Sequence, residues 1–600
     1  MPVAIRGQAV EGSETFLLFL IKPSHYDDAG FVIQWARNDM PSNTLATLYG
    51  IALDCEARGV LGDGVDLRIS ALDETNRRIR TGRIIRAFRR AGGKGLVALV
   101  GVQSNQYPRA LDLARPLRAA GIPVCIGGFH TAGSLAMLPK APPEIQDAWD
   151  LGISIFAGEA EGRLDEVLRD AKRGALRPLY RYTSDLPDLQ GAPPPFLPQS
   201  TIRRNLSART TFDAGRGCPF QCSFCTIINV QGRKSRYRSA DDVERIVRNN
   251  AAQGIRHFFI TDDNFARNRN WEAIFDRLIQ LREDESVGIN LIIQVDTLCH
   301  LIPNFIRKAG RAGVTRAFIG LENINPDNLI GAKKKQNRIT EYRTMLQAWK
   351  AIGVITCCGY IIGFPNDTRE RVLRDVEIIK RELPTDLLEF FYLTPLPGSE
   401  DHQILHQNGV WMDPDLNIYD AEHVTTGHPL MSADEWRRTY REAWAAFYTP
   451  EHVETLMRRA VACGIRARKI MMLCLWFYGS IAIESVHPLQ GGLFRRKYRR
   501  DRRPGLPAAS LLTFYPRYAF EILSKTTGLL ALAWRYDRIR RRVEADPAAA
   551  EYRDLALTPV TEAEIDDLEI FRATESARQA VAKARRQRAQ QRPLHPVQAA

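Results

Sequence analysis

The feature that most constrains the fold is a repeated alternation of short apolar runs with helical segments. Residues 16–22 and 96–102 are continuous apolar runs of strand length, which is typical of strands buried on both faces. Segments with helical periodicity, such as 45–58 and 109–120, lie between such runs. Strands that alternate with helices at this pitch predict parallel sheets. Because the pattern occurs in two long series within 600 residues, we expect an α/β protein of several domains.

The first series, residues 1–180, predicts a Rossmann-like domain in which helices cover a doubly wound parallel sheet. Ligands of such sheets bind beyond the carboxyl ends of the strands. Two of the predicted ends carry small or polar residues, namely Ser104 and the pair Gly127 and Gly128. Paired glycines let the backbone approach a flat ligand, so this edge is a candidate binding site.

The second series, residues 206–400, predicts six strand–helix units that form a partial, TIM-like (β/α)6 barrel. A proline-rich linker, residues 181–205, precedes it. Barrels of this kind carry their chemistry at the carboxyl ends of the strands, where this sequence places polar and small residues. These candidate site residues are Asp262, Asp263, Asn264, Gln294, Asp296, Glu322, Asn323, Gly359, Ile361 and Gly363.

A cysteine triplet, C-x3-C-x2-C, follows the first barrel strand at Cys218, Cys222 and Cys225. Three neighbouring thiolates suit a cube-shaped iron–sulfur cluster and would leave one iron open to a small molecule. A zinc site is the alternative, but zinc wants a fourth protein ligand, and the closest later Cys or His is His257. Ten cysteines in so long a chain are no disulfide framework, which indicates a reducing compartment.

The triplet, with Phe224 before its last cysteine, resembles the radical S-adenosylmethionine (radical SAM) enzymes. In that family the three cysteines hold a [4Fe-4S] cluster, the open iron binds SAM, and reduction cleaves SAM to a 5′-deoxyadenosyl radical. The resemblance implies that the cysteines are catalytic and that an electron donor such as flavodoxin or ferredoxin is needed. It also implies SAM contacts: residues 262–264 with the amino group, Gln294 and Asp296 beside them, Glu322 and Asn323 with the ribose and carboxylate, and Gly359, Ile361 and Gly363 with adenine.

The first domain resembles the cobalamin-binding domain of B12-dependent radical SAM enzymes. Ser104, Gly127 and Gly128 match positions that line the nucleotide tail of cobalamin in that family, and residues 158–161 resemble the segment that closes the domain. The D-x-H-x-x-G motif of histidine-ligated B12 proteins is absent, so no lower cobalt ligand is assigned. His25 and His130 are expected to be hydrogen-bonding loop residues. A Rossmann-like domain that has lost its cofactor, or binds only substrate, is the alternative.

Residues 401–545 predict a mostly helical domain, and residues 546–600 a charged, largely disordered tail. Two apolar stretches, 469–484 and 529–534, are too short to span a bilayer and are flanked by basic residues such as the run 495–503. Three interpretations stay open for this region: a helical cap over the barrel mouth, a surface that lies on an anionic membrane, or an RNA-binding face. Nucleic acid is the least favoured partner.

Together these features predict a cytoplasmic enzyme, because the N-terminus lacks the pattern of a secretory signal. By resemblance it would use SAM and cobalamin to transfer a methyl group to an unactivated carbon. The substrate would be a small molecule, or a lipid-like one reached from the inner face of the membrane. A cobalamin-assisted cyclisation or rearrangement is one alternative. A cobalamin-free radical SAM enzyme with an N-terminal binding module is another.

Overall fold

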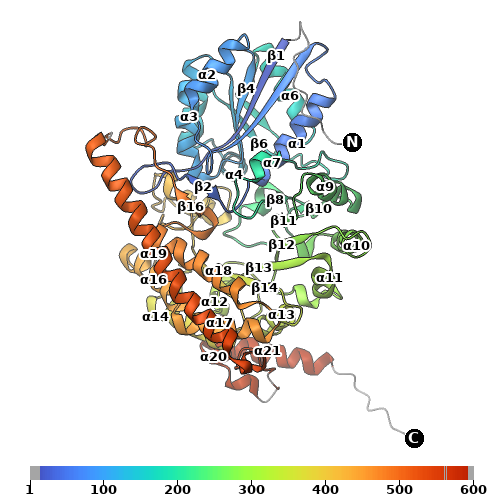
Figure 1. Cartoon of the computed structure of the whole chain (residues 1–600), viewed down its shortest axis with the longest axis vertical. Helices are drawn as coiled ribbons and strands as arrows, with labels where there is room; N and C mark the ends of the chain where they lie inside the picture. The colour runs from blue at the N-terminus through green and yellow to red at the C-terminus, as the bar shows by residue number, and fades with distance from the viewer. Residues whose placement is uncertain (1–13, 508, 560, 562–563, 592–600) are drawn as a thin grey trace.

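The computed structural model describes residues 14–507, 509–559, 561 and 564–591 (Figure 1). Two six-stranded parallel sheets follow one another along the chain, and in Figure 1 the first stands above the second. The C-terminal helices pack beside the second sheet. The predicted α/β class, with a Rossmann-like unit, a partial barrel and a helical C-terminal region, is confirmed.

The first sheet has the strand order β3-β1-β4-β5-β6-β7, and all its neighbouring strands are parallel. Its strands are β1 Glu14–Lys22, β3 Val65–Asp73, β4 Gly95–Leu99, β5 Val124–Gly127, β6 Ser154–Ala157 and β7 Leu179–Arg181. Its helices are α1 Asn43–Ala57, α2 Thr81–Arg90, α3 Tyr107–Ala119, α4 Phe129–Met137, α5 Pro143–Asp150 and α6 Leu164–Arg173. The chain changes direction across the sheet between β1 and β4, which is where ligands of doubly wound sheets bind.

The second sheet is an open barrel with the order β15-β14-β13-β12-β11-β8. Its strands are β8 Arg209–Phe212, β11 His257–Ile260, β12 Asn290–Val295, β13 Val314–Glu322, β14 Ile355–Ile362 and β15 Leu387–Tyr392. The main helices between them are α9 Ala240–Ala252, α10 Trp271–Glu283, α11 Phe305–Ala312, α13 Ile339–Ala351 and α14 Arg369–Glu382. Each predicted strand lies within three residues of the observed one, because apolar runs of this length report buried parallel strands directly.

The C-terminal helices cover the open edge of the barrel at β15. They are α16 Ala433–Phe447, α17 Pro450–Ala462, α18 Ala467–Gly479 and α19 Leu511–Ala545. Trp444 of α16 meets Phe390 of β15 with ring centroids 5.3 Å apart, and the buried core runs without a break from the barrel into these helices. The region therefore shields an edge strand of the barrel. None of the described helices combines the length and apolarity needed to cross a bilayer.

The tail predicted to be largely disordered is helical over much of its described part. The short helix α20, Glu569–Arg572, begins where Glu382 of α14 accepts hydrogen bonds from the backbone N–H groups of Glu569 and Ile570, both 2.9 Å long. Helix α21, Glu575–Gln591, buries Ala577 and Val581 against the barrel core. The sequence of this segment is so highly charged that it gave no sign of these few buried residues. Residues 592–600 lie outside the described part.

A small antiparallel sheet joins a strand near the N-terminus to a strand of the C-terminal region. Strand β2, Trp35–Asn38, pairs with β16, Gly492–Arg495, and the indole N–H of Trp35 donates to the carbonyl of Gln490 at 2.9 Å. A side chain on Gly492 would start 2.1 Å from the Trp35 ring, so only glycine fits. Arg495 is buried over Trp35 and pairs with Asp27 at 3.0 Å. Part of the predicted basic run 495–503 is therefore internal to the fold.

Candidate active site

The carboxyl ends of both sheets border one cavity of about 400 Å³. Ser104 and His130 reach it from the first sheet, after β4 and β5, and Asp263 reaches it from the barrel, after β11. Thr226, directly after the last cysteine of the triplet, lines the same space. Two edges that the sequence predicted as separate binding sites thus open into a shared chamber.

The cysteine loop is a compact turn between β9, Gly215–Arg216, and α8, Ile227–Val230. The backbone N–H of Cys218 donates to the carbonyl of Gly232 at 3.2 Å, which folds the loop back on itself. The sulfur of Cys222 accepts a hydrogen bond from the Gln336 amide at 3.3 Å. Burial raises the pKa of Cys225 to about 12, so its free thiol is neutral, and binding iron would displace its proton.

The cysteine triplet fits an iron–sulfur cluster. Cys222 lies close enough to contribute to the raised pKa of Cys218, Cys218 and Cys222 both contribute to that of Cys225, and all three thiols come from one eight-residue turn. In the described part of the chain, no three His, Cys, Asp or Glu side chains converge tightly enough to hold a single metal ion. A multi-iron cluster matches this arrangement better than zinc does, because each thiolate then binds a different iron.

Asp263 is the candidate acid that faces the shared cavity. It forms no ion pair with a described residue, and its side chain is exposed at the wall of the cavity. A cationic ligand in the cavity, such as an ammonium group, could therefore pair with this carboxylate directly.

Asp262, the residue before Asp263, stabilises the fold beside the cysteine loop instead of facing the cavity. Its carboxylate accepts hydrogen bonds from the backbone N–H groups of Ala214 at 2.7 Å and Gly215 at 2.8 Å, and from the amide of Asn268 at 2.9 Å. It thereby holds the end of β8 from which the cysteine loop departs. Gln294 donates to the Asp262 carbonyl at 3.2 Å and supports the same turn.

Asn264 and Asp296 form a hydrogen bond with one another and do not line the cavity. The amide of Asn264 donates to Asp296 at 2.9 Å, and Arg267 grips both oxygens of that carboxylate at 2.6 and 2.9 Å. The Arg267 guanidinium also lies 5.5 Å from the ring centroid of Phe220, inside the cysteine loop. These residues therefore position the loop against the ends of β11 and β12.

Glu322 and Asn323 end β13 in different environments. Glu322 adopts a left-handed backbone with φ of 63° and forms an ion pair with the buried ammonium of Lys334. That ammonium lies 5.5 Å from the ring centroid of Phe224, the aromatic residue of the triplet. Asn323 is fully buried and donates to the Tyr360 hydroxyl at 3.3 Å. Glu322 thus stays near the cysteines, whereas Asn323 serves the fold.

The fifth-strand residues form an apolar wall beside the cysteine loop. Ile361 packs in a small cluster with Phe224, Phe364 and Ala332. A Cβ atom on Gly359 would lie 3.0 Å from the Phe318 ring. Because glycine has no Cβ, the neighbouring rings have room to pack here. The strand therefore offers the flat apolar surface that an adenine would need.

Gly363 has the strictest backbone requirement of the predicted residues. Its φ is 118°, and an added Cβ would lie 1.9 Å from the indole of Trp436, which itself donates to the carbonyl of Ile362 at 3.2 Å. Gly363→Ala is expected to lower the free energy of unfolding by about 3 kcal/mol, through backbone strain and overpacking. Gly331→Ala, where a Cβ meets nothing within 4 Å, is the matched control and should be nearly neutral. Equal urea midpoints for the two variants would contradict this account.

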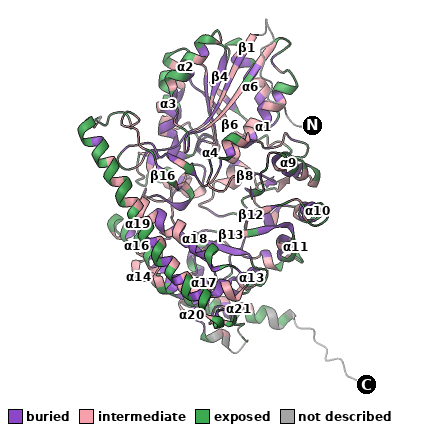
Figure 2. Cartoon of the chain, in the orientation of Figure 1, coloured by how far each residue is buried: buried purple, intermediate pink, exposed green. Residues whose placement is uncertain are grey.

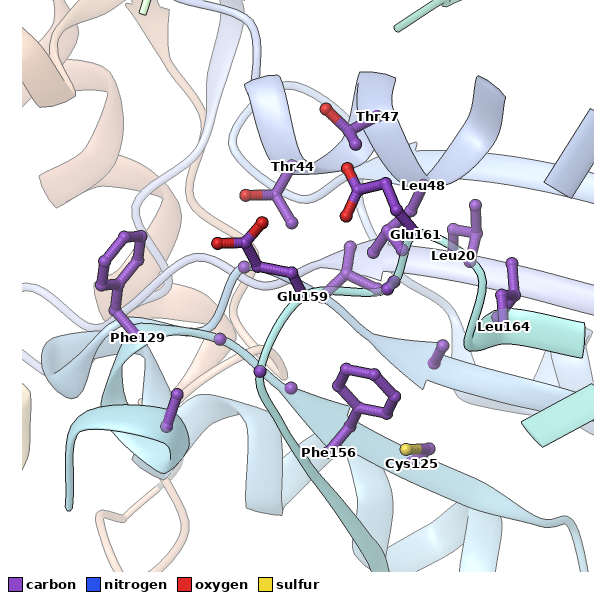
Figure 3. Close-up of a pocket in the computed structure, with 18 of the residues that line it drawn as sticks. Leu20, Thr44, Thr47, Leu48, Cys125, Phe129, Phe156, Glu159, Glu161 and Leu164 are labelled. Atoms are coloured by element: carbon purple, nitrogen blue, oxygen red, sulfur yellow. The ribbon is translucent and has the colours of Figure 1, made fainter. Parts of the chain in front are cut away.

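Two of the predicted cobalamin residues, Gly127 and Gly128, lie at a second, apolar cavity of about 160 Å³ that adjoins the shared one, whereas Ser104 lines the shared cavity (Figure 3). Glu159 and Glu161 approach it from the loop after β6, and Phe129 and Phe156 stand on another side. Gly127 and Gly128 line it, but a Cβ on Gly128 would meet the backbone of Val102 at 2.2 Å. The glycines are thus explained by close packing within the chain as well as by a ligand.

Ser104 and His130 form a buried pair in the shared cavity. The imidazole Nδ1 lies 3.2 Å from the Ser104 hydroxyl, and Nε2 lies 3.4 Å from a carboxylate oxygen of Glu144. Burial lowers the pKa of His25 to about 4, which keeps that ring neutral. The expectation that His130 is a hydrogen-bonding residue agrees with this geometry, but its placement in a loop is wrong, because the residue is buried in the first turn of α4.

Arg216 joins the first domain to the cysteine loop. Its buried guanidinium contacts Glu159 at 2.5 Å, Glu161 at 2.6 Å and Asp213 at 3.2 Å. Although burial alone would raise it, Arg216 holds the pKa of Glu161 below its usual value. The residue stands two positions before Cys218 and lines both cavities. An arginine so placed fixes the distance between the first sheet and the triplet.

Sequence reasoning missed Arg216, Arg267 and Lys334. Arg216 could have been noticed, because it directly precedes the Gly-Cys start of the triplet. Lys334 lies within three consecutive lysines, which looked like a solvated charge cluster. The contacts of Arg267 with Asp296 and Phe220 depend on the fold and leave no local signal.

Comparison with known proteins agrees with this geometry. Residues 214–379 match the model of the radical SAM superfamily. This segment of the chain is a radical SAM region. Because the matched segment starts before the triplet and ends after β14, this radical SAM region includes every predicted cluster and SAM residue. The predicted family is therefore confirmed, and the protein is an enzyme.

Two curated relatives are methyltransferases by name. Bacteriochlorophyllide d C-12(1)-methyltransferase of Chlorobaculum tepidum is 27% identical over 47% of this chain and 59% of its own length. Hopanoid C-2 methylase of Rhodopseudomonas palustris is 24% identical over 57% of this chain and 62% of its own length. The matches thus cover less than two thirds of either relative.

A solved structure shares the whole architecture. The radical S-adenosylmethionine methyltransferase TsrM from Kitasatospora setae, solved with cobalamin and a [4Fe-4S] cluster bound, aligns with a TM-score of 0.52 at 15% identity. The alignment covers 77% of this chain and 99% of that one. At this identity the similarity establishes a common fold.

Proposed function

We propose that this enzyme is a cobalamin-dependent radical SAM methyltransferase that acts on an unactivated carbon of a lipid-like substrate. The observation that carries the proposal is the junction of the two cavities. Thr44, Phe129 and Arg216 line both the apolar slot of the first sheet and the chamber beside the cysteine loop. A flat cofactor seated over the first sheet would therefore face the cluster and SAM directly.

The residues present fit these groups. When bound, the cluster and SAM supply a carbon radical, and cobalamin supplies the methyl group. Cys218, Cys222 and Cys225 would hold the cluster, and Asp263 would accept the SAM ammonium. Glu322 and Lys334 would orient the rest of SAM, and the wall at Ile361 would exclude water from its adenine. An electron donor such as flavodoxin or ferredoxin completes the proposal.

The substrate proposal rests on a third cavity, of about 690 Å³, beside the chamber. Segment 419–423 separates the two, since Asp420 lines the chamber and Glu422 lines the larger cavity. Its other walls carry four aromatic side chains, Tyr392, Tyr440, Trp444 and Tyr478, and the charged residues Asp28, Arg437 and Arg441. Its size is within the range of ligand pockets, and this lining suits a molecule with a rigid apolar body and a polar group. One of the named relatives acts on hopanoids, which supports a substrate of this class.

A cobalamin-free enzyme is the second candidate. The packing of Gly128 against Val102 favours it, because the glycine pair then needs no ligand to explain it. In that case the first domain would position the substrate alone.

Cofactor binding decides between the two. Anaerobically purified protein with a reconstituted cluster is expected to bind about one corrinoid per chain, measured by extraction and absorbance. His25→Ala and His130→Ala should leave the cobalt spectrum unchanged, since neither ring is proposed as a ligand. Reconstituted protein that cleaves SAM but retains no corrinoid would refute the methyltransferase and favour the second candidate.

A further inference from the structure

Helix α19 exposes an apolar face on the side turned away from the body. Seven apolar side chains of this helix are between 56% and 86% exposed. They are Leu511, Leu512, Tyr515, Phe520, Leu523, Leu530 and Trp534, and together they are called the α19 apolar face. In Figure 2 the outer side of the helix is largely exposed, and its first turns project beyond the body in Figure 1.

Helical geometry shows that this exposure has a direction. At 100° per residue, Leu512, Leu523, Leu530 and Trp534 fall within a sector of about 40°. The buried residues of the helix, Phe514, Leu532, Tyr536, Ile539 and Val543, lie on the opposite side. The face extends for about 35 Å along the axis. No described residue packs over it, and scattered exposure does not account for so long a stripe.

Charged residues in the first two thirds of α19 lie mainly on the side of the helix that faces the body. Between Leu511 and Trp534 the only charged residues are Arg517, Glu521 and Lys525. Glu521 pairs with Lys497, and Lys525 with Glu484, each at about 2.8 to 2.9 Å on the body side. A helix in water normally hides its apolar stripe and exposes its charges. Here the fold holds Glu521 and Lys525 and leaves the stripe outside, with Arg517 as the one exposed charge of this segment.

Basic residues continue the face at its carboxyl end. Arg535, Arg538 and Arg541 are exposed after Trp534, and the Arg538 guanidinium lies 4.9 Å from the centroid of the Trp534 ring. Arg496 and Arg500 are exposed in the loop that leads to the helix. An apolar stripe with Trp and Tyr bordered by arginines complements a lipid surface with anionic headgroups.

We propose that α19 docks this enzyme on an anionic membrane surface, with the apolar face inserted among the lipids. The body side of the same helix bears on the substrate cavity. Lys525 pairs with Glu484 in the π-helical turn Ser480–Glu484, and Ile481 and Ala482 of that turn line the aromatic cavity. Docking would therefore hold the cavity next to the lipid phase. The docking proposal does not depend on cobalamin or on the methyl transfer.

Vesicle sedimentation of the full-length, cluster-loaded protein tests the proposal. The protein is expected to co-sediment with phosphatidylcholine vesicles that contain phosphatidylglycerol, and about tenfold less with phosphatidylcholine alone. Leu523→Ser/Leu530→Ser should weaken binding to both vesicles about tenfold or more, since burial of apolar surface is lost. Arg535→Gln/Arg538→Gln should weaken only the electrostatic part of the binding, which is the part that raised salt also weakens.

Two matched variants control for unspecific effects. Ile330→Ser and Trp411→Ala remove apolar side chains that are 64% and 59% exposed outside α19, and both should bind vesicles like the parent. Because the serine variants keep every charge, they separate insertion from the attraction of any basic protein to anionic lipid. Cluster absorbance and SAM cleavage should be unchanged in all of them.

Three results would overturn the proposal. The first is no sedimentation with anionic vesicles at low salt. The second is equal vesicle binding by Leu523→Ser/Leu530→Ser and by Ile330→Ser. The third is a dimer in light scattering that Leu523→Ser/Leu530→Ser converts to monomer without vesicle binding by the parent, which would make the face an interface between two copies of this chain.

Discussion

Alanine in place of Cys218, Cys222 or Cys225 is expected to abolish both the iron–sulfur absorbance and the cleavage of SAM. Each change removes one of the three thiolate ligands that the cluster requires. The measurement is iron and sulfide content with the visible spectrum after anaerobic reconstitution, followed by the yield of 5′-deoxyadenosine with a chemical reductant.

Two buried cysteines outside the triplet serve as controls. Cys299 and Cys358 belong to the barrel core, and the Cys358 sulfur accepts a hydrogen bond from Thr385 at 3.3 Å. Their alanine variants should lose about 1 kcal/mol of stability and keep a full cluster. A triplet variant with normal iron content and normal 5′-deoxyadenosine would show that the ligands are wrongly assigned.

Arg216→Met is expected to lower the free energy of unfolding by about 3 kcal/mol and to reduce cluster occupancy, because Glu161 would be left buried without a cation. Glu159 and Asp213 would keep their second partners, Arg236 and Arg238. The urea midpoint of the apo protein and the iron content after reconstitution measure the two effects. Arg248→Met is the matched control, since Arg248 pairs with Glu244 and Glu285 at the surface and should contribute at most about 1 kcal/mol.

A double variant separates lost charge balance from lost packing. Adding Glu161→Gln to Arg216→Met removes the unpaired charge and should recover part of the stability. If Arg216→Met unfolded at the same urea concentration as Arg248→Met, the guanidinium would not link the first domain to the cysteine loop.

The parallel sheets and the triplet could be predicted because their signals are local. A run such as 355–362 is apolar at nearly every position, and only a strand buried on both faces needs that composition. The cluster assignment needed only the spacing of three cysteines. Strand-end motifs predicted positions near the site, but not whether a side chain such as Asp262 faces the chamber or the backbone.

Other features could not be predicted because their contacts are not local. The task of Lys334 depends on Glu322 and Phe224, which meet only when β13 and the cysteine loop are folded. Helix α19 was predicted only as a short apolar stretch. Pro516, Gly528 and the solvent-facing apolar residues disguise 35 residues of continuous helix. Its outward stripe contradicts the periodicity rule on which sequence reading depends.

The pairing of β2 with β16 has a consequence for how the protein is made. Trp35 and its partner Gln490 are 455 residues apart, so at about 5–20 residues per second the ribosome needs roughly half a minute or more between them. During that interval the first sheet and the barrel can fold while the strap that joins them is still missing. Gln490 also lines the shared chamber. The chamber is therefore completed late, which leaves a period of synthesis in which bulky cofactors can enter before β2 and β16 pair.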